Sequence, residues 1–229
     1  MISRNLTAVR QHIESVCRSV HRDSQEITLV AATKYASVAQ IRAALEAGLT
    51  DIGESKVQDA QEKFSQLGPA LTGVTKHMIG HLQTNKVKRA VQLFDLLQSV
   101  DSVKLVREIE RRAAQQERDV AVLIEINASG EEQKYGASCE GAFALVDEIL
   151  KGEHIILKGL MTVGPLSGHE EIIRQAFRQV KRLSRDIIRK YAGEARVQMQ
   201  YLSMGMTQDY PLALEEGANM LRIGSAIFA

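Results

Sequence analysis

One lysine, Lys34, stands directly after an unbroken apolar run at residues 27–33. A run of that length, rich in β-branched residues, is typical of a buried parallel strand, and such strands present polar groups at their carboxyl ends. At the mouth of an apolar interior, the Lys34 ammonium should lose part of its hydration, which leaves more free amine to condense with an aldehyde. From strand position alone, a solvated lysine with no chemical role is the favoured interpretation.

The closing segment of the chain changes that balance. Residues 221–228 form another apolar run, interrupted by Arg222 and by the pair Gly224-Ser225. Glycine and serine allow backbone N–H groups to approach a phosphate closely, and Ser203, on the preceding strand, can add a hydroxyl. A charged guanidinium inside an apolar strand needs a partner or a polar ligand, so we expect Arg222 to face one. An amine beside a phosphate-sized turn indicates a bound aldehyde phosphate.

A regular alternation of strands and helices must position these residues. Apolar strand-like runs alternate with amphipathic stretches along the chain, after an opening helix near residues 6–20. Strands are expected at residues 27–33, 50–53, 76–80, 95–100, 120–127, 155–163, 198–204 and 220–227. Connecting helices are expected at residues 37–47, 55–66, 84–92, 102–117, 138–150, 169–191 and 208–216. The pattern predicts an α/β fold, a (β/α)8 TIM barrel formed by residues 1–229 as a single domain, with an extra N-terminal helix.

An open, doubly wound sheet is the alternative to the barrel. No Gly-x-Gly-x-x-Gly follows the first strand and no Gly-Lys-Ser/Thr loop occurs, which weakens the nucleotide-binding form of that fold. Every expected strand ends in polar or glycine-rich residues. In a barrel these ends share one rim, where sites of this fold are built.

Composition limits the partners that the chain can have. Its 29 Lys+Arg and 28 Asp+Glu leave a net charge of +1, which argues against nucleic acid and anionic membranes as partners. No apolar stretch approaches the roughly 18 residues of a transmembrane helix. Cys17 and Cys139 have neither metal nor redox spacing, and the N-terminus lacks a signal-peptide pattern. A cytoplasmic location is therefore expected.

Two further pairs of polar residues carry weaker signals. His77 and His81 have the spacing of a helical metal pair, but along a strand and its loop they would stand about 13 Å apart. Glu54 and Asp101 follow strands that are two apart, and nothing fixes their separation for acid–base work. We predict no metal site and no catalytic residue.

Several segments together resemble the pyridoxal phosphate homeostasis proteins. They follow one another over almost the whole chain, at residues 31–34, 52–54, 77–86, 159–161, 202–209 and 222–228. Members of that family are single-domain barrels similar to the N-terminal domain of alanine racemase. The resemblance implies that Lys34 carries pyridoxal 5′-phosphate (PLP) as an internal Schiff base. The other cofactor-binding residues that it implies are Ser203, Met204, Arg222, Gly224 and Ser225.

In this resemblance, Ser203, Gly224 and Ser225 hold the phosphate and Arg222 faces the pyridine nitrogen. An arginine there disfavours protonation of the ring, which makes the ring a weaker electron sink. The resemblance therefore implies a monomer that holds PLP reversibly and takes part in intracellular PLP homeostasis and amino-acid balance, without robust catalysis. Transient contact with PLP-dependent apoenzymes is part of this expectation.

A fold-type-III PLP enzyme, a racemase or decarboxylase, is the alternative function. Alanine-racemase-like enzymes take a tyrosine base from a second domain, and this chain is expected to end where its barrel closes. Tyr35 adjoins Lys34, but neighbouring strand residues point to opposite faces, so Tyr35 is not expected to act on the same ligand.

One segment departs from the family pattern. Residues 53–56 read Gly-Glu-Ser-Lys, where the family commonly has Gly-Glu-Asn-Tyr. The departure puts a contact from that asparagine in doubt and adds an amine near the rim. Candidates for a second, transient attachment of the cofactor are Lys56, Lys86, Lys134 and Lys158.

Overall fold

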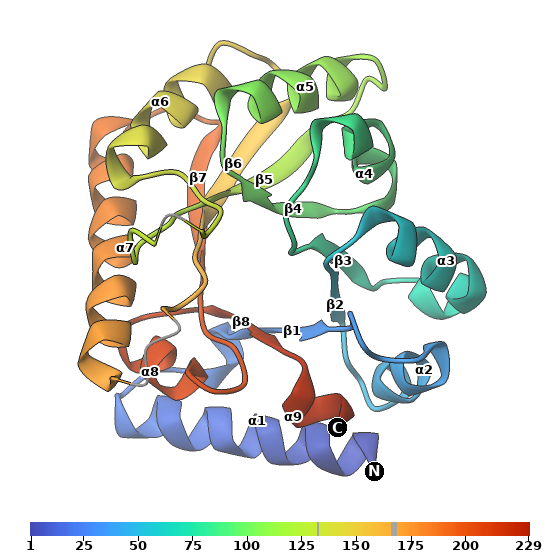
Figure 1. The fold of residues 1–229 in the computed structure, drawn as a ribbon. Coiled ribbons are helices and arrows are strands. Elements are labelled where there is room, and N and C mark those ends of the chain that lie inside the picture. The colour runs from blue at the N-terminus through green and yellow to red at the C-terminus, as the bar shows by residue number, and fades with distance from the viewer. Residues whose placement is uncertain (132, 166–168) are drawn as a thin grey trace.

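Eight parallel strands form a closed barrel in chain order, as predicted (Figure 1). The computed structural model describes residues 1–131, 133–165 and 169–229. The first and last strands pair, which closes the barrel. The strands are β1 (Thr28–Ala32), β2 (Asp51–Glu54), β3 (Thr75–Met78), β4 (Leu96–Val100), β5 (Val120–Glu125), β6 (Ile155–Met161), β7 (Val197–Ser203) and β8 (Met220–Ile223).

Helices surround the barrel (Figure 1). They are α1 (Ile2–Ser19), α2 (Val38–Glu46), α3 (Val57–Leu67), α4 (Val87–Leu93), α5 (Val103–Ala114), α6 (Cys139–Ile149), α7 (Glu170–Lys190), α8 (Tyr210–Glu215) and α9 (Ser225–Phe228). Short 3-10 turns are η1 (Ser24–Glu26), η2 (Gly68–Leu71) and η3 (Thr84–Lys86). Among the described residues, no helix is long and apolar enough to cross a membrane.

Serine caps begin several of these helices. Ser37 and Gln40 form a capping box at α2, and the Ser102 and Ser138 hydroxyls accept N–H groups at the starts of α5 and α6. The expected N-terminal helix is α1, which lies beside α9 so that the two ends of the chain are close together (Figure 1). Asn5 Nδ2 donates to Ile227 O at 3.1 Å and joins them.

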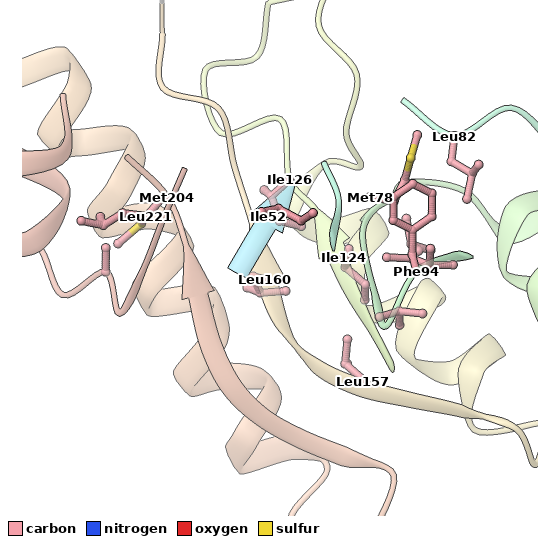
Figure 2. Close-up of a cluster of buried hydrophobic side chains, with 14 of the residues drawn as sticks. Ile52, Met78, Leu82, Phe94, Ile124, Ile126, Leu157, Leu160, Met204 and Leu221 are labelled. Carbon is pink, nitrogen blue, oxygen red and sulfur yellow. The ribbon is translucent and has the colours of Figure 1, made fainter. Parts of the chain in front are cut away.

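The apolar core has two parts, one outside the barrel and one within it. The larger part lies between the strands and the helices, where side chains such as Ile52, Ile124 and Leu160 are buried (Figure 2). The smaller part fills the barrel interior with Val30, Leu96, Leu123, Met161 and Met220. Each such side chain contributes about 1.5–3 kcal/mol when fully buried. The alternation of outward and inward positions decides which polar residues enter the barrel.

The largest error in the predicted elements concerns the last strand. It was expected to run to residue 227, but β8 ends at Ile223 and α9 follows. The Gly224 carbonyl accepts the N–H groups of Ile227 (2.9 Å) and Phe228 (3.1 Å), so the backbone turns into a helix. An apolar run alone does not distinguish a strand from a short buried helix.

Candidate functional site

Lys34 lies in a turn after β1, not on the strand itself. The strand ends at Ala32, and the Ala36 N–H donates to Thr33 O at 3.0 Å. The Lys34 side chain is exposed, so the expected loss of hydration is wrong. Its Nζ lies 4.8 Å from the centre of the Tyr35 ring, and a hydrogen bond with Lys34 lowers the pKa of Tyr35. Strand alternation does not apply within a turn, so the prediction that Tyr35 points away from Lys34 is also wrong.

A clamp formed by Lys63 and the buried Glu54 holds the backbone of this turn. Lys63 Nζ, from α3, donates to the carbonyl oxygens of Thr33 (2.6 Å) and Lys34 (3.3 Å). It also pairs with Glu54 Oε1 (2.8 Å), which accepts the Thr33 hydroxyl (2.6 Å). Glu54 is fully buried, and its Oε2 has no hydrogen-bond partner among the described residues. The backbone of Lys34 is therefore fixed while its amine reaches solvent.

The predicted phosphate turn lies beside the Lys34 turn. Ala31 of β1 pairs with Ile223 of β8, so the residues that follow the two strands share one rim of the barrel. Gly224 lies against β1, where an added Cβ would stand 3.2 Å from Ala32 O. Ser225 is the first residue of α9, and the first N–H groups of a helix have no acceptor within it. The turn thus presents backbone donors next to the Lys34 turn.

Arg222 is buried in the barrel interior, with 4% of its surface exposed. Its Nη1 donates to Ser203 O (2.8 Å) and Ser203 Oγ (2.7 Å), and its Nη2 donates to Thr162 O (2.8 Å). Burial lowers the pKa of Arg222 to about 10, although the carboxylates of Glu125 and Asp209 oppose that shift. Arg222 therefore stays a cation at neutral pH, held by backbone and hydroxyl oxygens.

Ser203 and Met204 already have partners in the structure. Ser203 Oγ donates to Gln98 Oε1 at 2.6 Å while it accepts from Arg222, so its hydroxyl hydrogen is committed. Met204 is fully buried in the outer core (Figure 2), and its N–H donates to Met220 O at 3.1 Å. A phosphate contact from Ser203 requires its hydroxyl to leave Gln98.

Glu125 is a buried charged residue that the sequence analysis missed. It ends β5, is 7% exposed, and lies within electrostatic range of Arg222 and Asp101. Burial raises its pKa to about 7; Arg222 opposes the shift and Asp101 adds to it. The sequence contains a sign of this burial, a charged residue within an apolar strand. Glu125 stands between Ile124 and Ile126, and Arg222 has a similar position in its own strand.

A cleft of about 790 Å³ opens beside Lys34, on the side of β2 and β3. Lys56 and Lys86, two of the four candidate second amines, line it. Lys56 also helps to lower the pKa of Tyr35. Tyr135 covers part of the cleft, with its ring stacked on His81 at 3.8 Å between centroids. This side of the rim is exposed and rich in amines.

The other two candidate lysines lie outside this cleft. Lys134 Nζ is held by Glu131 Oε1 (2.7 Å) and Gly164 O (3.0 Å), and Lys158 donates to Gln198.

The two histidines and the two carboxylates considered above do not form joint sites. His77 Nε2 lies 3.0 Å from Asp51 Oδ1, and His81 Nδ1 lies 3.4 Å from Asp101 Oδ2. Each histidine thus has a separate carboxylate. Glu54 belongs to the clamp outside the barrel.

The sequence is similar to one set of curated proteins over nearly its whole length. A family model described as "Alanine racemase, N-terminal domain" matches residues 4–229. The pyridoxal phosphate homeostasis protein of Haemophilus influenzae is 33% identical over 227 residues, which cover 99% of this chain and 94% of that protein. That of Aquifex aeolicus is 34% identical over 223 residues, which cover 97% and 95%.

Solved structures agree with this similarity. The crystal structure of an unknown protein from Bifidobacterium adolescentis has a TM-score of 0.94 and 33% identity, and the match covers 99% of this chain and 94% of that chain. PipY of Synechococcus elongatus, solved with PLP bound, has a TM-score of 0.86 and 28% identity, and each chain is covered completely. Alanine racemase of Clostridium difficile, at 14% identity and a TM-score of 0.77, shares the fold over 56% of its own length.

Proposed function

This chain belongs to the pyridoxal phosphate homeostasis protein family, and from that premise we propose that it binds PLP covalently through Lys34 and holds it reversibly. The relative PipY, solved with PLP bound, supports the choice of cofactor. When bound, PLP supplies an aldehyde that condenses with an amine and a pyridine ring that withdraws electrons. In this proposal residues 1–229 act as a single cofactor-binding domain.

The observation that carries the proposal is the shared rim of β1 and β8. The register that pairs Ala31 with Ile223 brings the Lys34 turn next to the turn at Gly224 and Ser225. A phosphate at the second turn would meet the N–H groups that begin α9, since those have no acceptor within the helix. An aldehyde on the same molecule would then be within reach of an amine on the neighbouring strand.

Arg222 fits the pyridine nitrogen of such a ligand. A guanidinium carries five N–H groups and no acceptor, and the contacts of Nη1 and Nη2 with Ser203 and Thr162 use three of them. A remaining N–H would donate to the ring nitrogen, which must then be unprotonated. Arg222 would therefore bind and orient the ring while it keeps the ring a weak electron sink.

Ser203 and Met204 complete the proposed cofactor-binding set. The carbonyl and hydroxyl oxygens of Ser203 both accept hydrogen bonds from Arg222. These contacts support an indirect role for Ser203 in cofactor binding, through the position of Arg222. Met204 shares the turn after β7, where Gly205 adopts a positive φ of 98°. An added Cβ at Gly205 would stand 2.7 Å from that of Ala213, so glycine is required there.

A carrier fits these features better than an enzyme does. An exposed Lys34 amine can exchange its ligand with solvent, and a ring held unprotonated by Arg222 is poorly suited to stabilising a carbanion. We therefore propose a PLP-holding monomer in the cytoplasm that supplies PLP-dependent apoenzymes by transient contact. The contact between Lys34 and Tyr35 favours one alternative, a fold-type-III racemase or decarboxylase, because a phenol with a lowered pKa stands beside the amine.

A spectroscopic titration tests cofactor binding. PLP added to the wild type should produce a visible absorption band that saturates, and Lys34→Ala should lack this band. Pyridoxal, which has no phosphate, should bind more weakly to the wild type because it cannot use the turn at Gly224 and Ser225. Equal bands in the wild type and Lys34→Ala would refute attachment through Lys34.

A stereoinversion assay separates the carrier from the enzyme. PLP-loaded wild type should convert no amino acid to its enantiomer faster than Lys34→Ala does. Robust turnover that is lost in Tyr35→Phe would establish the enzyme instead.

A further inference from the structure

A line of hydrogen bonds crosses the barrel interior beneath the candidate site. Arg222 Nη1 donates to Ser203 Oγ (2.7 Å), which donates to Gln98 Oε1 (2.6 Å). Gln98 Nε2 lies 3.0 Å from His77 Nδ1, and His77 Nε2 lies 3.0 Å from Asp51 Oδ1. These five residues, termed the relay, come from β8, β7, β4, β3 and β2.

The relay is buried along most of its length. Gln98, His77, Ser203 and Arg222 are each at most 4% exposed. Asp51 begins β2, and its side chain is 16% exposed. The relay therefore joins the guanidinium of the candidate site to the opposite end of the barrel. A wrongly directed hydrogen bond is costly in such a setting, because no water can replace it.

The hydrogen bonds of the relay share one direction in the structure. Arginine has no acceptor, so Ser203 Oγ accepts from Arg222, and its own hydrogen goes to Gln98 Oε1. The amide of Gln98 then turns its NH₂ group toward His77, whose Nδ1 must carry a lone pair. In this direction, the ring hydrogen that His77 shares with Asp51 is on Nε2.

The charged groups around the relay agree with this direction. Burial raises the pKa of Asp51, but hydrogen bonds from His77, Thr50 and Thr75 outweigh it and lower the pKa, so Asp51 is an anion that accepts. Besides Asp51, the group that faces His77 is the neutral amide of Gln98. Arg222 has the carboxylates of Glu125 and Asp209 in electrostatic range.

We propose that Gln98 and His77 are positioning residues for Arg222, acting through the direction of these hydrogen bonds. Gln98 takes the hydroxyl hydrogen of Ser203, which leaves a lone pair of Ser203 Oγ for the guanidinium. His77 keeps the amide of Gln98 in the required orientation. The ligand that Arg222 would contact is a heteroaromatic ring with an acceptor nitrogen. Only the identity of this ligand rests on the proposed function.

The first test needs neither a variant nor a cofactor. Nitrogen-15 NMR of the wild-type protein without PLP should show His77 with its hydrogen on Nε2 and a bare Nδ1. A folded protein whose His77 carries hydrogen on Nδ1 would overturn the relay. This measurement decides the direction of the relay even if the wild type binds no PLP, in which case only the proposed function fails.

The second test compares two replacements of Gln98. Gln98→Met keeps the side-chain length but removes the acceptor for Ser203, so PLP affinity should fall about tenfold. Gln98→Glu keeps that acceptor and has no donor, so His77 should gain hydrogen on Nδ1 while PLP affinity stays within about threefold of the wild type. If Gln98 mattered only for packing, the buried charge of Gln98→Glu would lower PLP affinity more than Gln98→Met does. A larger loss of affinity in Gln98→Glu than in Gln98→Met would therefore overturn the inference. If both variants fail to fold, the NMR measurement on the wild type decides.

Discussion

On the β7–β8 side of the barrel mouth, Arg222 and Ser203 are buried and held by hydrogen bonds from neighbouring strands, whereas on the β1–β2 side Lys34 and Lys56 project from turns into solvent. The buried side has its donors in place before any ligand arrives, so little ordering remains to be done on binding. The exposed side keeps the rotamer freedom of long amines. Fixed hydrogen-bond donors on one side and a mobile amine on the other suit a protein that must both hold a cofactor and release it.

Removing the buried cation should have the largest effect on stability. Arg222→Met leaves Thr162 O without its donor, leaves Ser203 O with only the Thr162 N–H and leaves Glu125 without its nearby cation, so the free energy of unfolding should fall by about 3–5 kcal/mol. Urea denaturation measures this loss. In Lys34→Ala, the matched change on the exposed side, the denaturation midpoint should match that of the wild type. If the free energy of unfolding fell by less than about 1 kcal/mol in Arg222→Met, the hydrogen bonds on the β7–β8 side would not stabilise the barrel as described.

Glu125, on the buried side, should make the free energy of unfolding depend on pH. Folding raises its pKa from 4.5 to about 7, so within that window the folded state binds a proton that the unfolded state has lost. The free energy of unfolding should therefore fall as pH rises from about 4.5 to about 7, by about 3 kcal/mol in total from this group.

Glu125→Gln should remove this part of the pH dependence and be the more stable protein above pH 7. Denaturation of both proteins at pH 5 and pH 8 makes the comparison. Equal slopes in the two proteins would show that Glu125 does not carry the effect.

The clamp under Lys34 should have a smaller effect, since Lys63 is partly exposed. Lys63→Met leaves the carboxylate of Glu54 buried and unpaired, and stability should fall by about 2 kcal/mol. The double variant Lys63→Met/Glu54→Gln removes the buried charge and should recover part of the loss. If the double variant were less stable than Lys63→Met, the pair would not explain the stability of this turn.

The smallest effect should come from Lys56, on the exposed side. Lys56→Gln removes one positive charge near Tyr35 and the cleft, so PLP affinity should weaken about twofold at low salt. At high salt the two proteins should bind alike, because solvent ions screen exposed charges. A tenfold loss that persists in salt would mean that Lys56 contacts the cofactor directly.

The sequence was sufficient to predict the barrel and the burial of Arg222. Alternating apolar runs predicted the order of the strands, and a charge within an apolar strand drew attention to Arg222. The same signal was available at Glu125 and Gln98 but was not used.

The surroundings of Lys34 could not be predicted in this way. The turn after β1 depends on a hydrogen bond between Ala36 and Thr33, and its clamp depends on Lys63 of α3. These are tertiary contacts, and the position of Lys63 on a helix gives no sign of what its amine reaches. Apolar character also failed to mark where β8 gives way to α9.

The central claim is that the exposed amine of Lys34 attaches the cofactor. Borohydride reduction of PLP-loaded protein, followed by peptide mass mapping, tests it most directly, with Lys34→Ala and the matched exposed variant Lys56→Gln alongside the wild type. The account predicts one adduct, on the peptide that contains Lys34, in the wild type and Lys56→Gln, and none in Lys34→Ala. Labelling of Lys56 or Lys86 in place of Lys34, or undiminished labelling of Lys34→Ala, would contradict it.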